Sequence, residues 1–147
     1  MNGPRSFTSL GASAQDLDTA SAERLLDAQA LHAAGRWASS IAMGLYSLET
    51  RLKARICRQL DLLRLPRPFE IHELDGLLLL SGLSRRLNQR SARPVKRNWN
   101  EVKKLAKDLN DLRYKPDPRW SQTLADDVLK WLVDPKEGVL PWIASQV

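Results

Sequence analysis

Helical periodicity is strongest in residues 37–60, which read WASSIAMGLYSLETRLKARICRQL. Apolar residues recur there every three or four positions, which predicts a long amphipathic helix. The members of this apolar series are Trp37, Ile41, Leu45, Leu48, Leu52, Ile56 and Leu60. Glu49 and Lys53 stand four residues apart on the polar side, a spacing at which opposite charges stabilise a helix. We expect the helix to end before Leu65-Pro66-Arg67-Pro68, because proline disfavours helix at the residue before it.

A second helix is expected on the N-terminal side. Residues 1–16 are rich in Ser, Gly and Ala and have no apolar period, so we expect a flexible tail there. Asp18 or Thr19 is the expected N-cap of a helix that runs to about Ala34 and is ended by Gly35. The predicted inner face of this helix holds Ala22, Leu25, Leu26, Ala30 and Ala33.

More helices are expected after the proline-rich segment. The leucines of residues 71–81 leave no clear polar face, which predicts a short and largely buried helix. Residues 84–97 are polar, basic and interrupted by Pro94, and we interpret them as mostly loop. Asn98 and Glu101 have the spacing of a capping box, which predicts a helix from there to residue 112. The last main helix is expected from Ser121 or Thr123 to about Val133, with one or two turns over residues 139–144.

These elements define the expected fold class. No run of residues alternates with the period of a strand between turn signals. The sequence therefore predicts an all-α protein, an antiparallel bundle of about five helices in a single domain over residues 17–147. Five tryptophans, at positions 37, 99, 120, 131 and 142, add a large apolar volume. Most of them are expected in the core and one or two in a subunit interface.

The composition excludes several classes of protein. A chain of 147 residues that is 43% hydrophobic and 27% charged is neither disordered nor collagen-like. Its longest charge-free apolar stretch, residues 37–48, is shorter than the roughly 20 residues that span a bilayer. The single cysteine, Cys57, excludes an internal disulfide framework, and two histidines are too few for a histidine-rich metal site. Residues 1–15 contain one basic residue and no apolar core segment, so we expect no secretory signal. We expect a cytoplasmic protein without metal, cofactor or membrane association.

Positive charge is concentrated in the middle of the chain. The net charge is +6, but residues 51–107 hold 15 basic and 5 acidic residues. Such a run is either a solvated helix face or a surface that contacts phosphates, where binding releases counterions. The candidate phosphate-binding residues are Arg85, Arg86, Arg90, Arg93, Lys96, Arg97, Asn98 and Lys103. A helix beginning at Asn98 would also offer free backbone N–H groups to an anion.

A second candidate site involves the proline-rich segment. His72 stands five positions after Arg67, just beyond the two prolines. An arginine and a histidine that lie close together can hold a phosphate and move a proton, as RNA cleavage without metal requires. The other interpretation of His72 is a helix-start residue that makes a local hydrogen bond.

Several segments together resemble the HEPN-domain family. Residues 33–38 and 48–56, Ala-Ala-Gly-Arg-Trp-Ala and Leu-Glu-Thr-Arg-Leu-Lys-Ala-Arg-Ile, are similar to the second-helix signature of that family. His72-Glu73-Leu74-Asp75-Gly76-Leu77-Leu78 resembles a later family segment. Leu112-Arg113-Tyr114 followed by Pro116, and the ending Gly138 to Ile143, resemble elements near the C-terminus. In order and spacing these segments cover about residues 20–145.

The resemblance implies an all-helical bundle, usually a homodimer, with a role in RNA or nucleotide transactions. Members often act in toxin–antitoxin or defence settings beside a minimal nucleotidyltransferase. Many active members are metal-free ribonucleases that use an arginine and a later histidine at the dimer interface. The matching segment here begins Arg97-Asn98 but has Val102 where the histidine is expected, and no histidine follows His72. The resemblance therefore implies that standard ribonuclease activity is absent.

Three functional hypotheses follow. The first is a non-catalytic HEPN-type protein that binds RNA or nucleotide phosphates through residues 84–107. The second is a divergent ribonuclease that uses Arg97, or Arg67 with His72, across a dimer interface. The third is a non-catalytic partner of a nucleotidyltransferase or toxin, which is favoured by the surplus of apolar residues, including Trp120 and Trp142 near the end of the chain.

Overall fold

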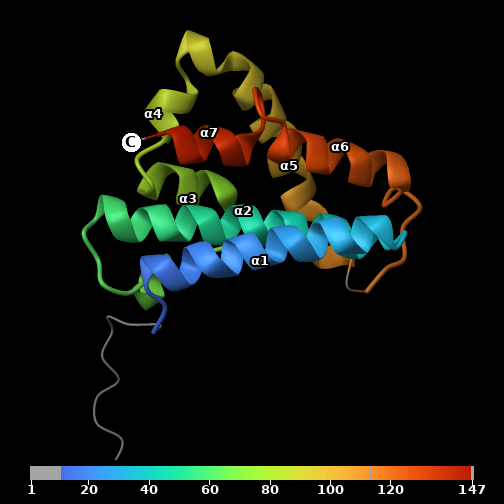
Figure 1. Ribbon diagram of the computed structural model, residues 1–147, viewed down its shortest axis with the longest axis horizontal. Helices are drawn as coiled ribbons and strands as arrows, with labels where there is room; N and C mark the ends of the chain where they lie inside the picture. Colours follow the sequence, from blue (N-terminus) through green and yellow to red (C-terminus); the bar gives the residue numbers. More distant parts are fainter. Residues whose placement is uncertain (1–10, 113, 147) are drawn as a thin grey trace, which may run out of the picture.

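The computed structural model describes residues 11–112 and 114–146. Regular structure within these ranges is helical throughout, which confirms the predicted all-α class (Figure 1). The α-helices are α1 (Ala14–Ala33), α2 (Trp37–Gln59), α3 (Leu74–Leu80), α4 (Ser84–Leu87), α5 (Arg93–Leu112), α6 (Gln122–Val133) and α7 (Val139–Ser145). Two 3-10 turns, η1 and η2, cover Arg67–Phe69 and Arg90–Ala92. None of the helices in the described ranges is long and apolar enough to cross a membrane.

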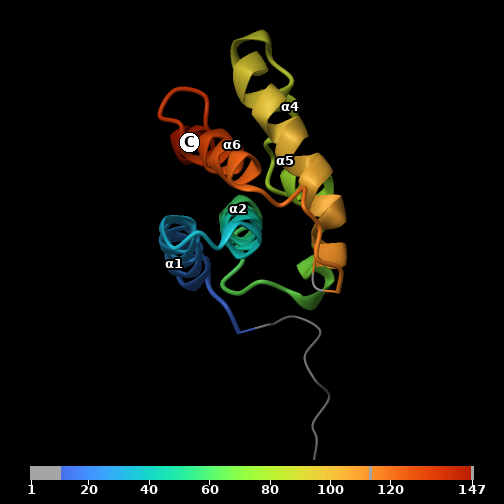
Figure 2. The same cartoon turned by 90° about the vertical axis from the view of Figure 1, so that its right-hand side faces the viewer.

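Helix α2 is the central element. Its predicted apolar series is buried between Ile41 and Ile56, whereas Trp37 is half-buried and Leu60 is exposed. Helix α6 packs against α2 at Gly44, where an added Cβ atom would lie 2.9 Å from Leu132 Cδ1. Figure 2 shows α1, α2 and α6 as neighbouring, roughly parallel axes, with α5 running steeply across them. The core therefore lies between α2 and the helices that cover it.

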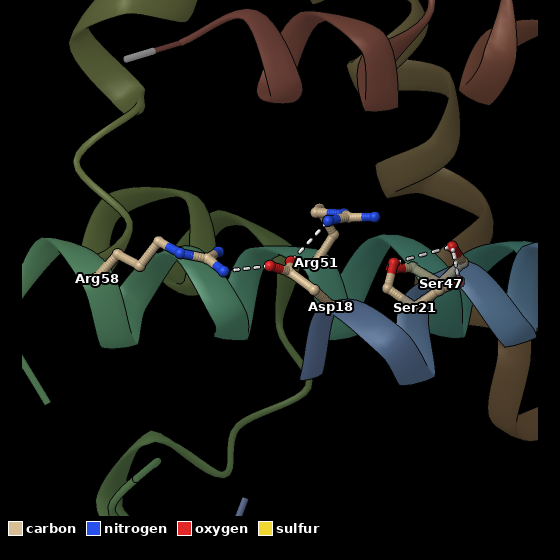
Figure 3. Close-up of polar contacts among 5 residues, drawn as sticks. All are labelled: Asp18, Ser21, Ser47, Arg51 and Arg58. Carbon is tan, nitrogen blue, oxygen red and sulfur yellow. Dashed lines mark hydrogen bonds and ion pairs between the residues drawn. The ribbon is translucent and has the colours of Figure 1, made fainter. Parts of the chain in front are cut away.

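Three buried serines form hydrogen bonds across the contact between α1 and α2. Ser21 Oγ donates to the Ser47 carbonyl oxygen at 2.7 Å, and Ser47 Oγ donates to the Ser21 carbonyl oxygen at 2.8 Å. Ser40 Oγ donates to the Ala28 carbonyl oxygen at 2.7 Å. In the Ser21–Ser47 pair, each hydroxyl bonds to the backbone of the opposite, antiparallel helix (Figure 3). They satisfy the buried hydroxyls, which would otherwise destabilise the interface.

Ion pairs close the same interface at the start of α1. Asp18 lies between two arginines of α2 (Figure 3). Its Oδ1 accepts Arg51 Nη1 at 2.6 Å, and its Oδ2 accepts Arg58 Nη2. Asp18 is therefore a tertiary contact residue inside α1 and not the N-cap predicted from the sequence.

The start and the inner face of α1 both differ from the prediction. The helix begins at Ala14 because Ser13 and Asp16 form a capping box, with Asp16 N–H donating to Ser13 Oγ at 3.1 Å. This start shortens the predicted tail of residues 1–16, of which residues 1–10 lie outside the described part. Four of the five predicted inner residues, Ala22, Leu26, Ala30 and Ala33, are exposed. The buried residues are Leu17, Ser21 and Ala28, a face too small and too polar to produce an apolar period.

The predicted loop at residues 84–97 is wrong, because that segment is mostly helical. It contains α4, η2 and the first turn of α5. Pro94 is the second residue of α5, a place where a missing N–H costs no helical hydrogen bond. Asn98 is therefore inside a helix and does not cap one, and no helix N-terminus lies there. Val95, Trp99 and Val102 form the buried face of α5.

The C-terminal third is closer to prediction. Ser121 is the N-cap of α6, accepting the Leu124 N–H at 3.3 Å, and α7 forms where one or two turns were expected. Trp99 and Trp120 are buried, while the other three tryptophans are half-buried. Arg113, part of one family-like segment, lies outside the described residues.

Candidate functional site

Helix α5 has a cationic face directly opposite its buried face. Residues 93, 97, 100, 104 and 107 follow one line at helical spacing, about 20 Å from end to end. The basic residues on or beside this line are Arg93, Lys96, Arg97, Lys103, Lys104 and Lys107. Because Val95, Trp99 and Val102 hold the other side of the helix in the core, these cations are held at the surface.

Two shallow depressions lie along this face and share Arg97 and Asn100. The first, about 590 Å³, is lined by Asn88, Gln89, Arg93, Lys96, Arg97 and Asn100. The second, about 500 Å³, is lined by Arg97, Asn98, Asn100, Glu101, Lys103 and Lys104. We refer to their combined lining as the cationic groove. Among the described residues that line the groove, only Glu101 is acidic. The side-chain amides of the asparagines and the glutamine in the groove can donate or accept hydrogen bonds.

Some cations of the groove already make hydrogen bonds or ion pairs within the protein, and others do not. Lys96 Nζ donates to Asn88 Oδ1 at 2.5 Å, and Lys103 Nζ pairs with an Asp75 oxygen at 3.1 Å. Lys104 makes an exposed pair with Glu101 at 3.4 Å. Arg93 and Arg97 are exposed and have no hydrogen bond or ion pair with any residue that the structure describes. These two guanidinium groups are therefore open to an incoming phosphate.

The structure brings together only part of the predicted phosphate-binding set. Arg93, Lys96, Arg97, Asn98 and Lys103 line the cationic groove. Asn98 is engaged there, because its Nδ2 donates to the Glu137 carbonyl oxygen at 2.8 Å. Asn88, Gln89, Asn100 and Lys104 were missed, and short amides in a polar segment carry no sequence signal that separates them from solvated residues.

The other predicted arginines line neither depression. Arg85 and Arg90 are exposed outside the groove. Arg86 is half-buried and donates to Gln146 Oε1 at 3.4 Å. Arg55 donates to the Gln146 carbonyl oxygen at 2.6 Å, and burial together with the nearby Arg86 lowers the pKa of Arg55. Arg86 and Arg55 therefore hold the C-terminal segment in place.

The position matched to the ribonuclease histidine is in the core. Val102 has no exposed surface, and it lies on the opposite side of α5 from Arg97. A side chain at position 102 cannot meet a substrate that Arg97 holds, because the helix stands between them.

A second constellation surrounds His72. Its Nδ1 lies 2.5 Å from Glu49 Oε1, and Lys53 Nζ lies 3.2 Å from the same oxygen. The side chains of Glu49 and Lys53 are only 14% and 11% exposed, whereas that of His72 is 81% exposed. Arg67, the predicted partner of His72, is exposed and has no polar contact with it among the described residues.

His72 and Glu49 line a cavity of about 240 Å³. The remaining lining residues are Leu45, Tyr46, Leu74, Ala106 and Leu109. The sequence pattern predicts Glu49 only as one half of a helix-surface pair with Lys53. Its closeness to His72, 23 positions away, could not be predicted without the tertiary fold. Within the described residues no group of three or more His, Cys, Asp or Glu side chains is placed to hold a metal ion.

Comparison with protein-family models, with curated proteins and with solved structures found no match. A function is therefore inferred from the residues of this chain and their arrangement.

Proposed function

We propose that this chain is a HEPN-type protein that binds RNA or nucleotide phosphates through the cationic groove and does not cleave RNA by the standard route of that family. The observation that carries the proposal is the exposed pair Arg93 and Arg97, which stand one helical turn apart without a described partner. Guanidinium groups bind phosphate oxygens in a bidentate manner, and neighbouring amides supply further donors. The family resemblance and the all-helical fold support the same assignment.

The buried Val102 supports the non-catalytic part of the proposal. The groove offers cations and amides but has no imidazole to act as a general base. The resemblance also implies a homodimer, which light scattering at several protein concentrations tests directly. A particle with the mass of one chain at all concentrations would contradict that part.

A binding titration tests the groove. Fluorescence anisotropy with labelled single-stranded RNA is expected to show binding at about 50 mM salt that weakens steeply as salt increases. The double variant Arg93→Ala/Arg97→Ala is expected to bind about tenfold more weakly or worse, because it loses two phosphate contacts.

The matched control is Arg36→Ala/Lys130→Ala, which removes the same charge from exposed positions outside the groove. It should retain nearly full affinity. Absence of binding by the wild-type protein at low salt, or an equal loss in both double variants, would overturn the proposal.

A second candidate, a divergent metal-free ribonuclease, is favoured by the contact of His72 with Glu49. A carboxylate that holds one ring nitrogen orients the other nitrogen as a base. Incubation of the purified protein with RNA in EDTA tests it, with His72→Ala alongside. Cleavage lost in His72→Ala would support this candidate, and equal cleavage by both proteins would exclude His72 as the base.

A further inference from the structure

The cavity beside His72 has the chemistry of a base-binding pocket. Leu45, Leu74, Ala106 and Leu109 give it apolar walls, and Tyr46 adds an aromatic ring. Its volume of about 240 Å³ falls below the roughly 300–1,000 Å³ of pockets for drug-sized ligands. A cavity of this size suits one planar ring system better than a whole nucleotide.

Two polar groups of this cavity, the side chains of Glu49 and His72, can act as hydrogen-bond acceptors. Lys53 and His72 both contact Oε1 of Glu49, which leaves the second carboxylate oxygen for a ligand. With the proton on Nδ1 facing Glu49, Nε2 of a neutral His72 ring is also an acceptor. The ligand that fits is therefore a planar heterocycle with N–H donors on one edge.

Among the four RNA bases, guanine matches this requirement. Its Watson–Crick edge presents two adjacent donors, the N1–H and the N2 amino group. The guanine acceptor O6 lies at one end of that edge and leaves the two donors together. Adenine, cytosine and uracil each have a single donor position there with an acceptor beside it, and that acceptor would repel the Glu49 carboxylate. Proteins read unpaired RNA bases by edge hydrogen bonds and by stacking on aromatic rings.

The cavity and the cationic groove lie on different sides of α5 and are linked through one ion pair. Lys103 lines the groove and pairs with Asp75, whose neighbour Leu74 lines the cavity. Trp99 Nε1 also donates to Asp75 Oδ1, at 3.4 Å, so this junction is fixed from the core. Ala106, one turn after Lys103 on α5, lines the cavity itself. A strand that leaves the groove over Lys103 and passes round the side of α5 can therefore bring one base to the exposed His72.

We propose that the cavity formed by Glu49, His72 and Tyr46 binds a guanine base, and so gives the phosphate-binding groove a preference for guanine-containing RNA. This inference rests on the proposed function for its RNA context. The donor pattern of the base, and not its phosphate, determines the preference.

Competition between uridine oligonucleotides with one central guanosine, inosine or adenosine tests the inference. The guanosine oligonucleotide is expected to bind about tenfold more tightly than the adenosine one, and inosine, which lacks the N2 amino group, to fall between them. Glu49→Gln is expected to remove the preference while the affinity for all-uridine RNA stays the same. Asp127→Asn is the matched control, because it makes the same acid-to-amide change at an exposed site on α6.

A second variant is needed in case Glu49→Gln misfolds, because that substitution leaves Lys53 without its carboxylate partner. Ala106→Leu fills the cavity and leaves every charge in place, and it is also expected to remove the guanosine preference. Equal affinity for the three oligonucleotides, with salt-dependent binding retained, would overturn the guanine pocket and leave the groove intact.

Guanosine itself separates the pocket from the groove, since it has no phosphate. Its titration is expected to shift the NMR resonances of the His72 ring, and adenosine is expected to shift them much less. If the His72 shift occurs while no oligonucleotide binds, the proposed function fails and the pocket stands. Identical responses to the two nucleosides would overturn the pocket independently of the groove.

Discussion

At the scale of single residues, the contact between α1 and α2 includes three buried serines. Ser21, Ser40 and Ser47 are each only 1% exposed, and each donates to a backbone carbonyl of the other helix. Hydropathy ranks serine as a surface residue, so sequence patterning assigned the inner face of α1 to the wrong residues. A small hydroxyl that is fully hydrogen-bonded can be buried where two backbones approach closely.

Val102 gives a prediction about the missing histidine. Introducing Val102→His would not create a nuclease, because this position is in the core, and it would destabilise the fold by about 3 kcal/mol through overpacking and an unpaired polar ring. Urea denaturation measures the stability, and RNA incubation in EDTA measures cleavage. Lys104→His, on the exposed side of the same helix, is the control and should be nearly neutral. A stable Val102→His variant that cleaves RNA would show that position 102 reaches the substrate.

At the scale of helices, patterns dominated by large apolar residues were predictive and others were not. The long apolar series of α2 and the short leucine helix α3 were predicted because burial of leucine and isoleucine dominates their energetics. Residues 84–97 were misread because Pro94 looks like a helix breaker, although at the first turn it fits. Of the candidate site, the cations of α5 could be predicted from charge density. The partners of His72 could not be predicted, and neither could the absence of described hydrogen bonds or ion pairs at Arg93 and Arg97, because both depend on tertiary contacts.

The capping box of α1 makes one part of the stability depend on pH. Asp16 accepts the backbone N–H of Ser13 and contacts the Ser13 hydroxyl, and these hydrogen bonds lower the pKa of Asp16 in the folded protein. Its contribution is therefore complete above the unfolded-state pKa of about 3.9 and is lost as the pH falls through the lower folded-state value. Asp16→Asn is expected to be less stable than wild type at neutral pH, with the gap closing in acid.

Urea denaturation of both proteins from neutral to acidic pH measures this gap. Asp127→Asn, at an exposed aspartate of α6 without a described partner, should show no comparable pH dependence relative to wild type. A gap between Asp16→Asn and wild type that stays constant across the range would mean that the carboxylate charge does not matter to the cap.

At the scale of the whole molecule, the positive charge is concentrated in one part of the sequence, and the fold brings much of it to one surface. Residues 51–107 carry a large positive excess, while the remaining residues hold 8 basic and 12 acidic side chains. The fold places six of the cations on one side of α5, where the opposite side is fixed in the core. A charge of +6 spread evenly would attract polyanions weakly, and this arrangement focuses it over about 20 Å of helix.

The salt dependence of the proposed RNA binding should report how many of these cations act together. Each phosphate contact on a single strand contributes about −0.7 to the slope of the logarithm of affinity against the logarithm of salt concentration. Contacts by Arg93, Lys96 and Arg97 would give a slope of about −2, and Arg97→Ala would make it shallower by about 0.7. An unchanged slope in Arg97→Ala would place the phosphate path elsewhere on the protein.

The serine contacts of α1 also affect how readily this helix opens locally. Leu17 is the only large apolar side chain of α1 that is buried in the described structure, so detaching this helix exposes few large apolar side chains of its own. Native-state hydrogen exchange is therefore expected to show α1 amides opening below the free energy of global unfolding and with little sensitivity to denaturant. Amides of α2, which buries many large side chains, should exchange only through global unfolding. The amides of α1 would then be less protected from hydrogen exchange than those of α2.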